Sequence, residues 1–134
     1  MEKYQILEHK ADLKIRAFGR TKEELFLNTM LGMAESLKPE IKKETIEREI
    51  KIKSLDLPTL LVDFLSEVLY LNQTNKEIYF EAVFKKLTDN EIETELIGEK
   101  VKRFGEDIKA VTYHDLEVKK KDDGTWEAII LFDV

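Results

Sequence analysis

The pattern of apolar and polar residues in the first quarter of the chain predicts a strand and then a helix. Residues 13–18 alternate between apolar and polar and stop at Gly19, which is typical of a strand that enters a turn. Thr21 can cap a helix, with Glu24 reaching back to the amide of the cap. Apolar residues then recur at intervals of three and four as far as Pro39, so a helix follows the strand.

The middle of the chain predicts a second strand and a second helix. Residues 46–52 alternate again, although Arg48 interrupts the apolar side of this strand. Residues 57–71 carry a continuous stripe of Leu, Val and Phe at helical spacing, and Pro58 suits the first turn of a helix. We expect residues 72–76 to form a loop.

The second half of the chain consists of strand-like segments separated by short polar stretches. Asp122-Asp123-Gly124 is a hairpin signal that makes the last two segments antiparallel neighbours. Residues 98–107 form the one stretch that suggests a mobile loop. The predicted strands are residues 78–87, 92–97, 108–118 and 126–132.

The order of these elements predicts an α+β fold, in which two helices pack on antiparallel β-sheet layers in a single domain over residues 1–134. A parallel doubly wound fold would need a helix after nearly every strand, which this chain lacks. The last segment is apolar on both faces, with Ala128, Ile130 and Phe132 on one and Ile129 and Leu131 on the other. Such a strand belongs in the middle of a sheet or between layers.

Charge and composition narrow the function. The 134 residues include 22 Lys and Arg against 28 Asp and Glu, a net charge of −6, which argues against a protein that grips a phosphate backbone directly. The absence of Cys excludes disulfides, thiolate metal sites and a Cys nucleophile. No signal peptide and no apolar run near the roughly 18 residues of a membrane span is present, so we expect a cytoplasmic protein without a membrane anchor.

The usual catalytic motifs are missing, which makes an ordinary enzyme a poor interpretation. Three polar clusters remain, at residues 8–12, at residues 109–115 and at the C-terminus. As a strand, the second cluster would place Lys109, Tyr113 and Asp115 on one face and Thr112 and His114 on the other.

The C-terminal cluster indicates a metal site. Asp133 follows an apolar strand and precedes the carboxylate of Val134, so about two negative charges lie close together where packing holds them still. Ligands that are all oxygen favour hard cations, namely Ca²⁺ or another such ion, Mg²⁺ or Mn²⁺. Asp12 would add a further oxygen if the first predicted strand lies beside the last one.

Each of these residues also has a simpler interpretation. Asp12 can be a turn residue that hydrogen-bonds its own backbone, and Asp133 a solvated end residue. His9 and His114 can be structural histidines held by hydrogen bonds, the latter on the same predicted face as Ile108, Ala110 and Leu116. Lys109 can be an ordinary surface lysine.

The motifs together resemble the archease family. Residues 4–9 followed by Ala11-Asp12 are similar to the His-Thr-Ala-Asp signature of the family, with Lys10 in place of Thr. Residues 60–71 resemble its leucine-rich second helix. Residues 108–116 and the apolar-Asp-Val ending resemble its C-terminal block, and the resemblance covers essentially the whole chain.

Archeases are accessory proteins of the GTP-dependent RNA-splicing ligase of tRNA splicing and RNA repair. The resemblance implies a protein that promotes guanylylation and multiple turnover of this ligase and broadens its nucleotide use, without carrying out ligation itself. The metal ligands of the family fall on Asp12, Asp133 and Val134. Lys109 matches a functional lysine, and His9 and His114 lie in the matching motifs as candidates for partner contact.

Two other functions stay open at this point. One is a general chaperone or scaffold for RNA-processing enzymes with a purely structural metal, which would need large exposed apolar patches. The other is a small metal-dependent hydrolase, for which His9 is the one nearby candidate for a general base.

Overall fold

The computed structural model describes residues 1–8 and 12–134. In that part of the chain a pair of strands precedes the first helix, a long strand separates the two helices, and five strands follow the second helix. In chain order the elements are β1 (Tyr4–Glu8), β2 (Asp12–Gly19), α1 (Lys22–Ser36), β3 (Pro39–Lys53), α2 (Leu57–Asn75), β4 (Glu77–Leu87), β5 (Glu91–Phe104), β6 (Ala110–Val111), β7 (Glu117–Lys120) and β8 (Trp126–Asp133).

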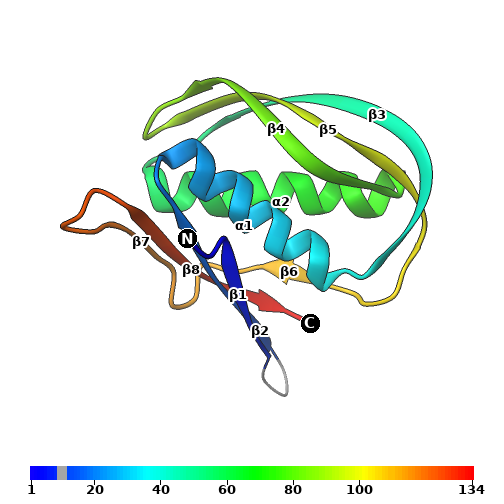
Figure 1. Ribbon diagram of the computed structural model, residues 1–134, viewed down its shortest axis with the longest axis horizontal. Helices are drawn as coiled ribbons and strands as arrows, with labels where there is room; N and C mark the ends of the chain where they lie inside the picture. The colour runs from blue at the N-terminus through cyan, green and yellow to red at the C-terminus, as the bar shows by residue number, and fades with distance from the viewer. Residues whose placement is uncertain (9–11) are drawn as a thin grey trace.

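These elements form three layers, as Figure 1 shows, with the two helices between two antiparallel sheets. One sheet has five strands in the order β1-β2-β8-β6, with β7 also paired to β8, and the other has the order β3-β5-β4. The α+β architecture predicted from the sequence is therefore confirmed, and its two helices serve both sheets at once.

Strand β8 lies at the centre of the five-stranded sheet because both of its faces are apolar. It pairs with β2 along its whole length on one side and with β6 and β7 on the other. The hairpin from β7 to β8 turns at Gly124, whose φ of 87° is a conformation that glycine adopts without a steric penalty. The predicted hairpin and the predicted central position are both present.

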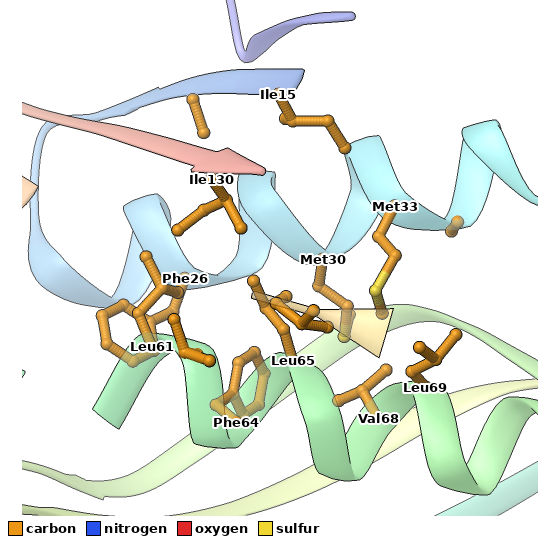
Figure 2. Close-up of a cluster of buried hydrophobic side chains, with 14 of the residues drawn as sticks. Ile15, Phe26, Met30, Met33, Leu61, Phe64, Leu65, Val68, Leu69 and Ile130 are labelled. Atoms are coloured by element: carbon orange, nitrogen blue, oxygen red, sulfur yellow. The ribbon is translucent and has the colours of Figure 1, made fainter. Parts of the chain in front are cut away.

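The helices carry the core on their facing sides. Figure 2 shows Phe26, Met30 and Met33 of α1 opposite the apolar stripe of α2, with Ile15 and Ile130 contributed by the five-stranded sheet. The rings of Phe26 and Phe64 lie 5.7 Å apart, and both also contact Phe84 of β4. No helix in the described ranges is both long and apolar enough to cross a membrane.

Side-chain caps set where each helix begins. The hydroxyl of Thr21 accepts the amide of Glu24 at 3.1 Å, as expected, while the Glu24 carboxylate accepts from the amide of Arg20, one residue earlier than expected. Asp56 caps α2 by accepting the amide of Thr59 at 2.9 Å. The helix α2 continues through residues 72–75, where a loop was expected.

Two predictions were wrong, the mobile loop at residues 98–107 and the single strand at residues 108–118. Residues 98–104 belong to β5 and do not form a mobile loop, because they pair with both neighbours: Lys100 lies opposite Glu77 of β4, and Val101 lies opposite Ile41 of β3. Residues 108–118 do not form one strand, since β6 covers two residues and the chain leaves the sheet before β7. The alternating apolar and polar residues there include a turn, in which Asp115 has a φ of 54°.

One strand was not predicted, and another is longer than predicted. Residues 4–8 form β1, which pairs with β2 in register from Tyr4 opposite Ala17 to Glu8 opposite Leu13. Strand β3 begins at Pro39, because its first part pairs with the end of β5 across a register shift.

Arg48, which interrupts the apolar side of β3, is explained by a buried carboxylate. Glu77 is fully buried and receives two hydrogen bonds from the Arg48 guanidinium, at 2.9 and 2.7 Å. The Tyr79 hydroxyl donates to it at 2.7 Å, and the Lys100 ammonium lies 3.1 Å away. Burial alone raises the pKa of Glu77, but these hydrogen bonds outweigh burial and lower its pKa to about 2.

The Glu77 network predicts a specific acid sensitivity. Because the pKa falls from 4.5 in the unfolded chain to about 2 in the folded one, its stabilisation is complete above pH 4.5 and is lost as the pH falls through 2. A difference of this size corresponds to about 3 kcal/mol in the free energy of unfolding. We expect Glu77→Gln to lower stability at pH 7 by this order and to flatten the dependence on pH between 4.5 and 2.

Denaturant titrations from pH 2 to pH 7 measure this effect. Glu44→Gln, which changes an exposed carboxylate on β3, is the matched control. Its free energy of unfolding should depend on pH with the same slope as that of wild type. The same slope for Glu77→Gln as for wild type would contradict the assignment.

Gly98 of β5 is required by the close approach of β4. A Cβ atom at this position would collide with the backbone carbonyl of Ile78 and with the Cα of Tyr79, next to the irregularity in the register between Tyr79 and Glu81. Backbone atoms in a paired strand cannot move aside without breaking the ladder. We expect Gly98→Ala to cost about 2 kcal/mol or more in thermal or chemical denaturation, whereas Lys102→Ala on the same strand changes stability by less than about 0.5 kcal/mol.

Candidate functional site

The two aspartates predicted to bind a metal lie directly opposite each other. Asp12 begins β2, Asp133 ends β8, and the two are cross-strand partners. Side chains of directly opposed residues share a face of the sheet, with Cβ atoms about 5 Å apart, and like charges in this arrangement repel. The terminal carboxylate of Val134 follows within one residue. We refer to Asp12, Asp133 and this carboxylate as the acidic tip.

Core packing holds the acidic tip in place. Leu13, the residue after Asp12, is 5% exposed, and Phe132, the residue before Asp133, is fully buried. Phe132 also pairs with Val111 of β6, and the backbone amide of Lys109 donates to the carbonyl of Asp133 at 2.7 Å. The register therefore cannot slip without moving apolar side chains into water.

Among the described residues, no side chain balances the charge of the acidic tip. Within residues 1–8 and 12–134, no ion pair involves Asp12, Asp133 or the terminal carboxylate. The Oδ1 atom of Asp12 is buried and has no hydrogen-bond partner in this part of the chain. Buried carboxylate oxygens normally have a partner, so these atoms fit a cation.

The side chains alone do not make up a complete metal site. Among the described residues, no group of three or more Asp, Glu and His side chains could hold a metal ion. The candidate set consists of two side chains and a main-chain carboxylate, and Ca²⁺ takes six to eight oxygen ligands. Water or a partner molecule would have to supply the remainder.

A cavity of about 210 Å³ opens beside the acidic tip. The polar residues described in its lining are mostly acidic, and Lys38, the one cation among them, lies 3.6 Å from Glu106. The lining consists of Glu8, Asp12, Leu13, Ser36, Lys38, Glu106, Asp107, Ile108 and Val134. We call it the tip cavity.

Sequence reasoning missed Lys38, Glu106 and Asp107 as neighbours of the acidic tip. The end of α1 brings them there: Lys38 has a φ of 47°, and its carbonyl accepts the amide of Gly105 at 2.8 Å. The amide of Glu106 donates to the carbonyl of Leu37 at 3.2 Å. No spacing in the sequence signals these contacts, because they depend on the path of β5 past the helix.

Lys109 is near the acidic tip through its backbone amide, and the residue is exposed. It borders a separate groove of about 250 Å³ against α2, which we call the α2 groove. This groove is lined by Ser66, Leu69, Tyr70, Gln73, Lys109, Ala110 and Val111. Lys109 therefore belongs to the α2 groove and is not among the described residues that line the tip cavity.

Of the two histidines, the structure describes His114, which is not brought together with the aspartates. His9 and the unusual Lys10 lie outside the described residues. His114 is on the exposed turn before β7, where its Nε2 atom lies 3.4 Å from the Asp115 carboxylate, and it does not line the tip cavity. The expected buried face shared with Ile108 and Ala110 was wrong, because no strand spans these residues.

A second polar contact that the sequence did not predict connects this turn to α2. The hydroxyl of Tyr113 donates to Asp63 Oδ1 at 2.7 Å, and the hydroxyl of Ser54 donates to Asp63 Oδ2 at 2.6 Å. The hydrogen bond to Asp63 and burial both raise the pKa of Tyr113. The contact fixes the orientation of an aromatic ring that is otherwise 57% exposed.

Comparison with known proteins gives a consistent result over the whole chain. The curated archeases of Methanosarcina barkeri and Thermococcus kodakarensis are 38% and 32% identical, with 99% and 96% of this chain covered and 97% and 96% of theirs. The solution structure of protein 1598 from Methanobacterium thermoautotrophicum has a TM-score of 0.71 at 26% identity, with 100% of both chains covered.

A crystal structure from Thermotoga maritima, of an archease described as a possible chaperone, shares the fold with a TM-score of 0.71 at 21% identity, covering 100% of this chain and 99% of that one. The family model described as the archease protein family (MTH1598/TM1083) matches residues 4–134. The chain therefore belongs to the archease protein family.

Proposed function

We propose that this protein is an accessory activator of the GTP-dependent RNA-splicing ligase. In this role it promotes guanylylation and multiple turnover of the ligase and broadens its nucleotide use, and it does not catalyse ligation itself. Asp12, Asp133 and the terminal carboxylate of Val134 bind a hard divalent cation of the Ca²⁺ type. Membership of the archease family supports the accessory role.

The observation that carries the proposal is the pairing of Asp12 with Asp133 at the end of a buried central strand. Two carboxylates directly opposite each other cost stability in the absence of a counter-charge. A domain that needed only to fold would do better with a neutral residue at either position. Keeping both is explained by a cation that the pair binds.

The chain would hold such a cation at a rigid end of the molecule where a partner can reach it. Asp133 is exposed, and Asp12 is half-buried with one orphaned oxygen. A bound hard cation would supply positive charge to phosphate oxygens in the nucleotide site of a partner. The net charge of −6 agrees with action through the ligase, since direct binding of RNA relies on clustered Lys and Arg.

A general chaperone or scaffold is the alternative, and the Thermotoga maritima relative is described as a possible chaperone. Chaperones for partly folded clients expose broad apolar patches. The large apolar side chains exposed in the described residues are spread over several elements, for example Leu7 on β1, Tyr70 on α2 and Val83 on β4. This distribution favours a specific partner.

Neutral, isosteric substitutions test the acidic tip. We expect Asp12→Asn and Asp133→Asn each to weaken Ca²⁺ binding at least tenfold by calorimetry, because each removes one anionic ligand. Without Ca²⁺ both variants should be at least as stable as wild type, since the cross-strand repulsion is gone. Stimulation of ligase guanylylation, measured with labelled GTP, should fall at least tenfold.

Asp122→Asn, in the turn between β7 and β8, is the matched control and should bind Ca²⁺ and stimulate the ligase like wild type. Full stimulation by both folded tip variants would overturn the proposed role of the cation. Tip variants that lose Ca²⁺ and still stimulate guanylylation would leave the metal as purely structural.

The terminal carboxylate is tested by moving it. Deleting Val134 shifts the carboxylate onto Asp133, and we expect Ca²⁺ affinity to fall several-fold with a small change in melting temperature, because this side chain is 39% exposed. Val134→Ala keeps the carboxylate in place and is the control. Equal Ca²⁺ affinity of the deletion variant and wild type in calorimetry would remove this carboxylate from the ligand set.

A further inference from the structure

Exposed apolar side chains lie on α2 and on the segments next to it. Leu55, in the loop before the helix, is 90% exposed, Tyr70 is 59% exposed, and Tyr113 is 57% exposed. Asp63 and Tyr70 are seven residues apart and lie on the same face of the helix. Together with Lys109 in the α2 groove, we call Leu55, Asp63, Tyr70 and Tyr113 the α2 strip.

Hydrogen bonds hold two parts of this surface in place, the backbone at Leu55 and the ring of Tyr113. The side-chain amide of Asn90 donates to the carbonyl of Leu55 at 2.9 Å and to that of Ser54 at 3.3 Å. Asp63 holds the hydroxyls of both Ser54 and Tyr113. The Tyr113 ring, held by Asp63, loses little conformational entropy on binding, and aromatic groups of this kind act as anchors in protein interfaces.

The α2 strip is joined to the acidic tip by backbone contacts. Gln73 of the α2 groove donates to the carbonyl of Ile108 at 2.7 Å, and the next residue, Lys109, donates its amide to Asp133. Ile108 lines the tip cavity, whereas Lys109 lines the groove. A partner that reaches the acidic tip from this side therefore also meets the end of the strip formed by Tyr70 and Lys109.

The acidic tip alone is too small to hold a protein partner. Specific protein interfaces bury at least about 1,000 Å², far more than two side chains and a chain end provide. The additional surface must lie next to the tip, and the α2 strip adjoins it through residues 107–110.

Charge indicates what kind of partner fits. Lys109 forms no ion pair in the described part of the chain, and no acidic residue lines its groove. An acidic side chain beside apolar residues would complement it. Nucleic acid fits poorly, because a strip with a single lysine cannot neutralise a row of phosphates.

We propose that the α2 strip is the surface on which the partner ligase docks, with an acidic side chain of the ligase in the Lys109 groove and apolar side chains against Leu55, Tyr70 and Tyr113. This inference rests on the proposed function and adds the interface that positions the tip.

Binding of the purified ligase to surface variants tests the inference. Leu55→Ser with Tyr70→Ser should raise the Kd at least tenfold, and Lys109→Glu should raise it more than Lys109→Gln does. Phe80→Ser with Val83→Ser, at positions of β4 that are 46% and 45% exposed, is the matched control and should change the Kd less than twofold. All variants should bind Ca²⁺ like wild type, because none is in the acidic tip.

A second measurement does not depend on loss of binding. Since the chain has no Cys, Leu55→Cys and Val83→Cys each give one site for a photoactivated cross-linker. Only the label at position 55 should cross-link to the ligase.

The outcomes separate the two proposals. A ligase that binds wild type and the strip variants equally would overturn the docking surface and leave the proposed function intact. A wild-type protein that does not bind the ligase would overturn the proposed function and this inference with it. A wild-type dimer by sedimentation that the strip variants convert to monomers, with unchanged ligase binding, would assign the strip to a second copy of the chain.

Discussion

The pairing of β2 with β8 is the constraint on which the rest of the molecule depends. Eight consecutive residue pairs join the two strands, from Asp12 with Asp133 to Gly19 with Trp126. The alternation that buries Ile15 and Ile130 against the helices also decides which residues meet at the strand ends. A shift by one residue would expose the core face and separate the two aspartates, so folding and the candidate site depend on the same register.

Charged groups are treated in opposite ways at two places in the fold. Glu77 is deeply buried and surrounded by Arg48, Tyr79 and Lys100, so its charge is neutralised by the chain itself. Asp12 and Asp133 face each other with no such support in the described residues. A buried charge that the chain itself neutralises is part of the folded structure. A pair of like charges without a counter-charge at a rigid end of the fold indicates a ligand from outside the chain.

Periodicity predicted the elements whose pattern follows from burial, and it failed where tertiary contacts decide. The stripe of α2 and the two-sided apolar character of β8 follow from local sequence and were predicted correctly. The extent of β5 was not, because residues such as Lys100 become strand only through their neighbours on β3 and β4. Alternation at residues 108–118 was misleading, since a turn with Tyr113 bonded to α2 produces the same spacing.

In the candidate site, too, some features follow from the local sequence and others depend on tertiary contacts. The concentration of carboxylates at the C-terminus could be read from the sequence, and its meeting with Asp12 followed once the first predicted strand was placed beside the last. The acidic lining contributed by Glu106 and the place of Lys109 at the α2 groove depend on how β5 and the following segment pass the helices. No local pattern contains that information.

The central place of β8 also affects the order in which the domain can form during synthesis. This strand is the last described element of the domain to leave the ribosome, yet β6 and β7 pair with it, and β2 pairs with it along one whole edge. The three-stranded sheet and both helices can associate earlier, while the hairpin of β1 and β2 has an unpaired edge until β8 arrives. Pairing between residues that lie more than 100 positions apart is slow to form, and the nascent domain therefore exposes a strand edge that the finished protein covers.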